Sequence, residues 1–260
     1  MAQLWSMLAR NYARFDTPLR PNAETLAAVR ALLSGADPLV VVLGGTPIFG
    51  ELAQRVWFVD VAAEALGLVT ATPQQRTIQK NWLEAADEFA QADLIVGDAS
   101  INAVESPAVA AQLLQLLATS RKRGAALALR VFVKHELPDD QFRERLTSAF
   151  DRKQFSEVRF LVYGSVAGVD GQTSVADVDR YIADLQTHLP LNRDVLDAYR
   201  AAYFEWRGVS PTAAQTMTTK MFFPPRALVE EMFAAAGLRV STISAGSFPL
   251  AQFTPIYVTA

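Results

Sequence analysis

The chain has 260 residues and a formal net charge of −3, and 51% of its residues are hydrophobic. This length and apolar content predict one large folded domain, or a domain with a cap, and exclude a globally disordered chain. The chain contains no cysteine and two histidines. Disulfides, thiolate metal sites and a cysteine nucleophile are therefore excluded, and no metal site is expected.

Charge and hydropathy patterning narrow the class of partner. Basic residues are nowhere dense enough to indicate a nucleic-acid surface, and no apolar stretch approaches the roughly 20 residues that a membrane span requires. The first residues lack the charged and apolar regions of a signal peptide. We expect a soluble, cytoplasmic protein that binds a small molecule and neither nucleic acid nor membrane, and a homodimer is left open.

Two helices are predicted before the first strand. Apolar and aromatic residues at helical spacing predict an amphipathic helix over residues 3–15. After a proline-containing breaker, Asn22 is placed to cap a second helix that ends before Gly35. Because a sheet does not need these helices, residues 1–35 are expected to lie over a ligand cleft.

Strands alternate with helices through the next hundred residues. This alternation predicts a parallel sheet with helices on both faces, which is a doubly wound, Rossmann-like α/β fold. Two last strands joined by a Gly/Ser/Pro loop indicate an antiparallel finish to the sheet. The predicted core covers 36–137 and 224–260, with strands over 39–43, 56–59, 77–79, 92–97, 125–133, 238–244 and 253–259.

A largely helical block, residues 138–223, interrupts this alternation. Helical spacing recurs through it, and Ser174 with Asp177 three residues later forms a helix-capping pattern. Residues 155–163 also fit a helix face; the residue types at 158–163 would suit a strand as well, and we favour the helix. The block is rich in aromatic residues, so it is predicted to form a cap over a small, partly apolar substrate.

The most informative segment is the apolar run of residues 40–43, which stops at Gly44 and Gly45. A second apolar run, residues 56–59, ends on Asp60. Glycines without a Cβ let a ligand approach the backbone, and a carboxylate at the tip of the next strand can accept hydrogen bonds from ribose hydroxyls. The pattern predicts an adenosine cofactor; a tight turn and a helix cap are the alternatives without a ligand.

These elements resemble the class I S-adenosylmethionine-dependent methyltransferases, most closely a subset whose glycine loop reads Leu-Gly-x-Thr-Pro. The loop is matched by residues 43–47, and the subset's Pro-Leu-Arg-Pro element by residues 18–21. Its fourth-strand and fifth-strand patterns are matched by residues 97–102 and 129–133. The resemblance implies a seven-stranded sheet whose last strand is antiparallel, with the cofactor across the carboxyl ends of the first strands.

The resemblance also implies which residues hold S-adenosylmethionine. The glycine loop would take its amino-acid end, Asp60 its ribose, and Asn81 with Trp82 its adenine. An Asp is usual in the family where this chain has Asn81, and the Asn amide can still bond to adenine. The cofactor-binding residues expected on this basis are Gly44, Gly45, Thr46, Pro47, Asp60, Asn81, Trp82, Asp98, Ala99, Ser100 and Arg20.

The sequence offers three candidates for a catalytic residue: His135, Asn102 and Tyr12. His135 follows the fifth strand and could act as a general base, although a solvent-exposed loop histidine is the favoured interpretation. Tyr12 and Arg20 would close the cleft from the N-terminal side. Arg130 lies in an apolar strand, so its charge must be paired or face a cavity.

Three functions compete. The leading hypothesis is a methyltransferase that transfers a methyl group to O, N or C of a small metabolite by in-line displacement, in which positioning supplies most of the rate. The second is a non-catalytic S-adenosylmethionine-binding partner or pseudoenzyme. The third, an NAD(P)-dependent oxidoreductase, is less favoured because Gly44, Gly45 and Gly50 do not follow the Gly-x-Gly-x-x-Gly spacing.

Overall fold

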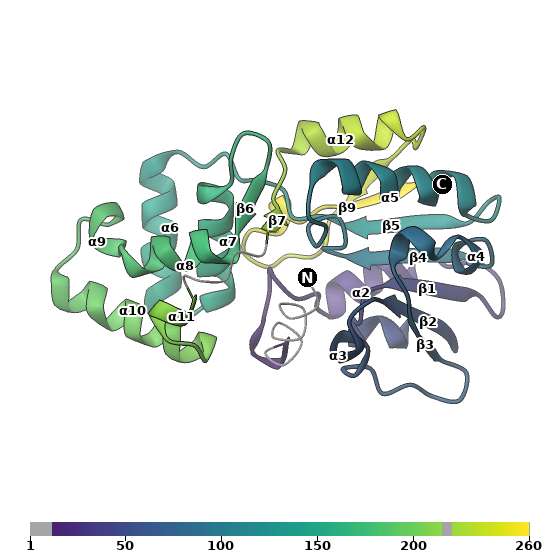
Figure 1. The fold of residues 1–260 in the computed structure, drawn as a ribbon, viewed down its shortest axis with the longest axis horizontal. Coiled ribbons are helices and arrows are strands. Elements are labelled where there is room, and N and C mark those ends of the chain that lie inside the picture. Colours follow the sequence, from purple (N-terminus) through teal and green to yellow (C-terminus); the bar gives the residue numbers. More distant parts are fainter. Residues whose placement is uncertain (1–11, 215–219, 260) are drawn as a thin grey trace.

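The computed structural model describes residues 12–214 and 220–259. Seven strands form the main sheet in the order β3-β2-β1-β4-β5-β9-β8 (Figure 1). The first five are parallel, and β9 runs antiparallel to both of its neighbours. The predicted seven-stranded sheet with an antiparallel last strand is confirmed. The strands are β1 (Leu39–Leu43), β2 (Arg55–Asp60), β3 (Arg76–Gln79), β4 (Leu94–Asp98), β5 (Ala126–Arg130), β8 (Ser241–Ile243) and β9 (Ile256–Thr259).

The central strand β1 explains where a ligand can bind. All five of its residues are buried, as expected for a β-branched parallel strand that is covered on both faces. β2 pairs with one edge of β1 and β4 with the other, so the strand order reverses at β1. The connections after β1 and β4 therefore diverge, and they leave a crevice at the carboxyl ends of the strands.

Helices cover both faces of the sheet because successive side chains of each strand alternate between faces. Val40 and Val42 pack in one core cluster with α2 and α3, while Val41 and Leu43 pack in another with α4, α5 and α12. The fold is therefore doubly wound, as predicted. The helices of this core are α2 (Ala23–Arg30), α3 (Ala63–Leu66), α4 (Ala86–Phe89), α5 (Pro107–Ser120) and α12 (Arg226–Ala235), with short 3₁₀ helices at Pro47–Glu51, Trp82–Glu84 and Ala251–Phe253.

The N-terminal prediction is tested only in part. Residues 3–11 of the first predicted helix lie outside the described residues, and Tyr12–Arg14 form a 3₁₀ helix. The second predicted helix is α2, and the Asn22 side chain caps it by accepting a hydrogen bond from the Thr25 backbone N at 3.0 Å.

Strand β5 is shorter than the predicted 125–133 and ends at Arg130. The next residues have no strand partner: the Val131 and Val133 amides donate to carbonyls of residues 255 and 253, in the segment before β9. The apolar run therefore continues beyond the end of β5, and its residues pack between the sheet and the cap.

The segment from residue 139 to residue 222, here named the cap, supplies most of a third hydrophobic cluster, which Phe132, Phe223 and Leu250 join from outside the cap. Figure 1 shows the cap beside the carboxyl ends of the sheet strands. The helix favoured for 155–163 is confirmed as part of α7, and Ser174 and Asp177 form the predicted capping box. A two-stranded antiparallel sheet of β6 and β7 was not predicted. The cap contains α6 (Asp139–Asp151), α7 (Phe155–Val166), β6 (Gln172–Ser174), α8 (Val175–Ala183), α9 (Leu185–His188), α10 (Arg193–Arg207), α11 (Pro211–Ala214) and β7 (Lys220–Phe222).

Among the described helices, none is both long and apolar enough to cross a membrane.

Candidate active site

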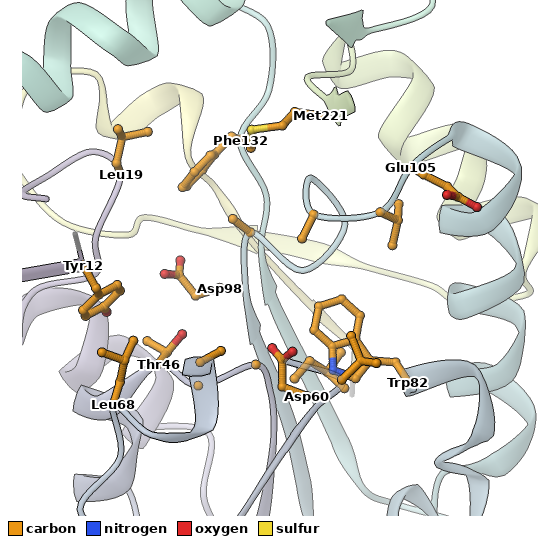
Figure 2. A pocket seen from close by; sticks show the side chains of 18 of the residues that line it. Tyr12, Leu19, Thr46, Asp60, Leu68, Trp82, Asp98, Glu105, Phe132 and Met221 are labelled. Atoms are coloured by element: carbon orange, nitrogen blue, oxygen red, sulfur yellow. The ribbon is translucent and has the colours of Figure 1, made fainter. Parts of the chain in front are cut away.

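A cavity of about 400 Å³ lies at the carboxyl ends of β1, β2 and β4 (Figure 2). Its volume and its mixture of apolar walls with a few polar groups are typical of small-molecule sites. Three parts of the chain meet there: the strand ends, the segment after residue 12, and the cap. The strand ends supply Gly44, Thr46, Asp60, Asp98 and Ala99; the N-terminal segment supplies Tyr12, Phe15 and Leu19; the cap supplies Arg159, Tyr163 and Met221.

Gly44 and Gly45 are each required in the loop after β1, but for different structural reasons. Gly44 has φ of +110°, a backbone conformation that other residues rarely adopt. Gly45 is needed for packing, because a Cβ there would lie 1.9 Å from the backbone O of Ala65 in α3. Both glycines and Thr46 line the cavity, whereas Pro47 starts the following 3₁₀ helix and does not. The glycine pair therefore brings α3 close to the strand end and opens the cavity wall.

Asp60 lies at the tip of β2 and lines the cavity. Its Oδ1 accepts a hydrogen bond from the Ala62 backbone N at 2.8 Å, so the carboxylate also holds the turn before α3. Burial raises the pKa of Asp60 to about 6, while bonds from the Ala62 and Val61 amides act in the opposite direction. At neutral pH the group is a partly desolvated anion, which is a strong acceptor for paired hydroxyls.

Trp82 and Asn81 follow β3 and also line the cavity. The Trp82 indole Nε1 donates to the Val59 carbonyl at 2.6 Å, and this bond fixes the ring beside Asp60 (Figure 2). The Asn81 side-chain oxygen accepts from the Leu83 backbone N at 3.0 Å and caps the short helix there. Asn81 thus has a capping role as well as a place on the cavity wall.

Asp98 at the end of β4 forms an ion pair with Arg130, its partner across the β4–β5 ladder. Both side chains are almost fully buried. Burial raises the pKa of Asp98, and the Arg130 guanidinium opposes that rise. Arg130 Nη1 also donates to the Pro18 carbonyl at 2.9 Å, so the pair ties the N-terminal segment to the sheet. Sequence reasoning left open whether Arg130 is paired or faces a cavity, and it is paired.

The residues after Asp98 separate into two groups. Ala99 lines the cavity with φ of +53°, a strained conformation for a residue with a Cβ and one that often marks functional sites. Ser100 is buried below it and is not part of the wall; a Cβ at Gly97 would lie 2.3 Å from its Oγ. Of the three cofactor-binding residues predicted here, Asp98, Ala99 and Ser100, the first two line the cavity.

The three catalytic candidates are not brought together. Tyr12 lines the cavity, burial raises its pKa, and its ring lies 5.1 Å from the Arg20 guanidinium carbon. Arg20 itself is not on the wall. Asn102 is fully buried and does not line the cavity; its amide bonds to the Phe132 N and O and to the Phe222 O.

His135 is also away from the cavity, and the expectation of an exposed loop histidine is wrong. The ring is buried, its Nε2 lies 2.8 Å from the Leu161 carbonyl, and it stacks on Phe142. Burial lowers its pKa. The Val133 and Lys134 amides bond to two loops, which turns the chain so that residue 135 enters the packing between the sheet and α7.

The sequence predicted a cap over the substrate, but it did not single out Arg159 and Tyr163 as residues of the site. Arg159 and Tyr163 come from α7, and Phe132 and Met221 come from the segments beside it. One signal was present: Arg159 is a lone cation in an otherwise apolar run, the same pattern that marked Arg130. Within the described residues, no group of three His, Cys, Asp or Glu side chains is arranged to hold a metal ion.

Comparisons with known proteins agree on the fold. No protein-family model and no curated protein sequence matches the chain. The CcbJ methyltransferase from Streptomyces caelestis is 10% identical, with a TM-score of 0.55 over 96% of this chain and 94% of its own. A SAM-dependent methyltransferase from Methanosarcina mazei is 12% identical, with a TM-score of 0.51 over 89% of this chain and 94% of its own.

A third structure, from Rhodobacter sphaeroides, is provisionally named as a Zn-dependent alcohol dehydrogenase. It is 13% identical, with a TM-score of 0.58 over 99% of this chain and 96% of its own. Identities this low establish a common fold and not a common activity. The sheet order, the antiparallel β9 and these neighbours together show that the chain has the Rossmann-like fold of the class I methyltransferases.

Proposed function

We propose that this protein is an S-adenosylmethionine-dependent methyltransferase that acts on a small molecule. The observation that carries the proposal is Asp60, a partly buried carboxylate at the tip of β2 that faces a cavity between Gly44 and Trp82. Ligands of open α/β sheets bind in this crevice, and a strand-end carboxylate there is suited to ribose hydroxyls. The methyltransferase neighbours add support at the level of the fold.

The residues on the wall fit the parts of this cofactor. Asp60 would accept hydrogen bonds from the ribose, and the fixed Trp82 indole would lie against the adenine, with Asn81 near its edge. The backbone at Gly44 and Thr46 would lie along the amino-acid end. Pro47, Ser100 and Arg20 do not line the cavity, so we assign them no direct contact with the cofactor.

When bound, S-adenosylmethionine supplies a sulfonium whose methyl group passes directly to a nucleophile of the acceptor. The chain's own residues then have a positioning task, because alignment of the reacting atoms accounts for much of the rate of such displacements. The Asp98–Arg130 pair gives the cavity a rigid floor. The apolar side chains of the cap and of the N-terminal segment exclude water from the acceptor side.

Calorimetry tests the proposal directly. We expect S-adenosylmethionine and S-adenosylhomocysteine to bind with one site per chain, and NAD not to bind. A methyl-transfer assay over a panel of small acceptors should then yield a methylated product. Binding of NAD in place of the adenosylmethionine pair would refute the proposal, and saturable binding with no product from any acceptor would favour the non-catalytic alternative.

A matched pair of variants tests the site. Asp60→Ala should weaken nucleoside binding by about 1.5–3 kcal/mol, because it removes a charged acceptor from paired hydroxyls. Glu144→Ala is the control, since it removes a carboxylate from an exposed position of α6 and should leave the affinity unchanged. Equal affinities in folded Asp60→Ala and wild type would refute the ribose assignment.

A further inference from the structure

Arg159 is a buried cation in the middle of an apolar helix. Every residue of α7 from Phe155 to Gly164 is buried, and Arg159 itself is 1% exposed. An isolated charge in such surroundings is strongly unfavourable unless it is paired or bound to a ligand. The side chain also lines the cavity, so part of it borders the space that a ligand would occupy.

The described residues satisfy only part of its guanidinium group. Nη2 donates to the Tyr163 hydroxyl at 2.7 Å, and the guanidinium carbon lies 5.2 Å from the centre of the same ring. Nη1 is buried and has no hydrogen-bond partner among the described residues. A buried guanidinium nitrogen with no acceptor is rare in native proteins and requires an explanation.

Among the described residues, no carboxylate is in ion-pair contact with Arg159, although Asp179 is near enough to act on it electrostatically. Of the two buried acids of the cap, Asp179 is bound to Arg207 at 3.0 Å and accepts from the Tyr203 hydroxyl at 2.9 Å. Glu157 is paired with Arg152 at 2.9 Å. The segments 1–11 and 215–219 contain no Asp or Glu. One positive charge therefore remains without a counter-ion at the cap side of the cavity.

The position of Arg159 in the cavity indicates which part of a bound ligand it would contact. Asp60 and Trp82 mark one end of the cavity, Phe132 and Met221 mark the other, and Asp98 lies between them (Figure 2). Arg159 belongs to the cap helix and not to the strand ends, and its neighbour Tyr163 stacks on Phe223 in the aromatic core of the cap. The cation therefore comes from the cap, which is the side assigned to the acceptor.

We propose that the methyl acceptor is a small carboxylic acid with an apolar body, whose carboxylate binds Nη1 of Arg159. This inference rests on the proposed function and specifies its substrate class. Tyr163 already accepts a bond from Arg159, so its hydroxyl proton is available to the second carboxylate oxygen. A single negative charge matches the single uncompensated cation, whereas a phosphate dianion would need further donors.

The test uses matched acid and amide probes: benzoate with benzamide, hexanoate with hexanamide, and cinnamate with cinnamamide. Each is titrated into the protein with and without saturating S-adenosylhomocysteine. We expect at least one acid to bind the wild type about tenfold or more tightly than its amide, because a charge-assisted bond is lost in the amide. Arg159→Gln should bring that ratio close to one.

Two further variants serve as controls. Arg193→Gln removes a cation that is 87% exposed on α10, and it should leave the preference unchanged. Tyr163→Phe keeps the charge and removes the hydroxyl, so the acid should bind several-fold more weakly while still outcompeting the amide. If Arg159→Gln does not fold, Tyr163→Phe still tests the site.

The outcomes separate the two proposals. No acid preference in any wild-type pair, or a preference that survives Arg159→Gln, would overturn this inference. A loss of S-adenosylhomocysteine affinity in Arg159→Gln as large as the loss of acid binding would also overturn it, because the guanidinium would then serve the cofactor's own carboxylate. Failure of the wild type to bind S-adenosylhomocysteine would count against the proposed function instead.

Discussion

Replacing Asp60 by Asn should stabilise the protein without ligand and weaken its binding of the nucleoside. Burial raises the pKa of the Asp60 carboxylate from 3.8 to about 6, which means that ionised Asp60 destabilises the folded state. The Asn side chain keeps an oxygen for the Ala62 amide, which Asp60 Oδ1 accepts from in the wild type. The substitution therefore removes the charge and retains the turn.

The size of the effect follows from proton linkage. A folded-state pKa above the unfolded-state value means that the folded chain binds the proton more tightly, so ionisation lowers stability as pH rises between the two values. A rise from 3.8 to about 6 corresponds to about 3 kcal/mol at pH 8, where Asp60 is ionised in both states. At pH 5 the difference should be about half as large.

Urea unfolding of wild type and Asp60→Asn at pH 5 and pH 8 measures this difference. We expect the variant to be more stable at both pH values and the gap to widen with pH. The same variant should bind S-adenosylhomocysteine about tenfold or more weakly at pH 8, because a carboxylate is a stronger acceptor than an amide. A gap that is absent or independent of pH would refute the electrostatic account of Asp60.

Three further predictions concern the same region. Affinity of the wild type for S-adenosylhomocysteine should fall about tenfold between pH 7 and pH 5, because Asp60 is protonated over that range; calorimetry at both pH values measures it. Gly45→Ala should lower the free energy of unfolding by about 1–3 kcal/mol or more, because the new Cβ would meet the Ala65 backbone at 1.9 Å; Gly67→Ala, where the nearest atom would be 3.4 Å away, should change it by less than about 0.5 kcal/mol. Asn102→Ala should destabilise the fold by about 2–4 kcal/mol in urea, because it leaves buried backbone groups unpaired, and the folded variant should bind the nucleoside as the wild type does.

The sheet could be predicted from the sequence because its strands carry strong local signals. The first strand was placed to the residue, since Leu39–Leu43 is a β-branched run bounded by a loop and a glycine. The pair β6 and β7 carries no such signal. Each strand has three residues, and the two come together from positions nearly 50 residues apart. A short strand that exists only because of a distant partner leaves no periodicity in the chain.

The strand-end residues of the site were predictable for a geometric reason. In a parallel sheet the carboxyl ends of the strands lie at the same edge. Gly44, directly after β1, therefore comes close to Asp60 and Asp98, the last residues of β2 and β4. That rule weakens within a few residues of the strand end. Asn102 and His135 follow β4 and β5 by four and five residues, and their loops turn them into the packing below the cavity. A residue can therefore be placed at the cavity from the sequence only when it lies at the end of a strand or directly after it.

The two buried arginines show what a charge in an apolar run can and cannot predict. Arg130 and Arg159 carry the same sequence signal, which requires a partner without identifying it. For Arg130 the partner is fixed by strand register, because Asp98 is its neighbour across the β4–β5 ladder. Arg159 lies on a helix, where no ladder supplies an acid. Of the described residues of the cap, the buried acids Glu157 and Asp179 are bound to Arg152 and Arg207. Arg130 is therefore part of the scaffold, whereas we propose that Arg159 binds a ligand. The two roles can be distinguished only when the positions of the neighbouring carboxylates are known.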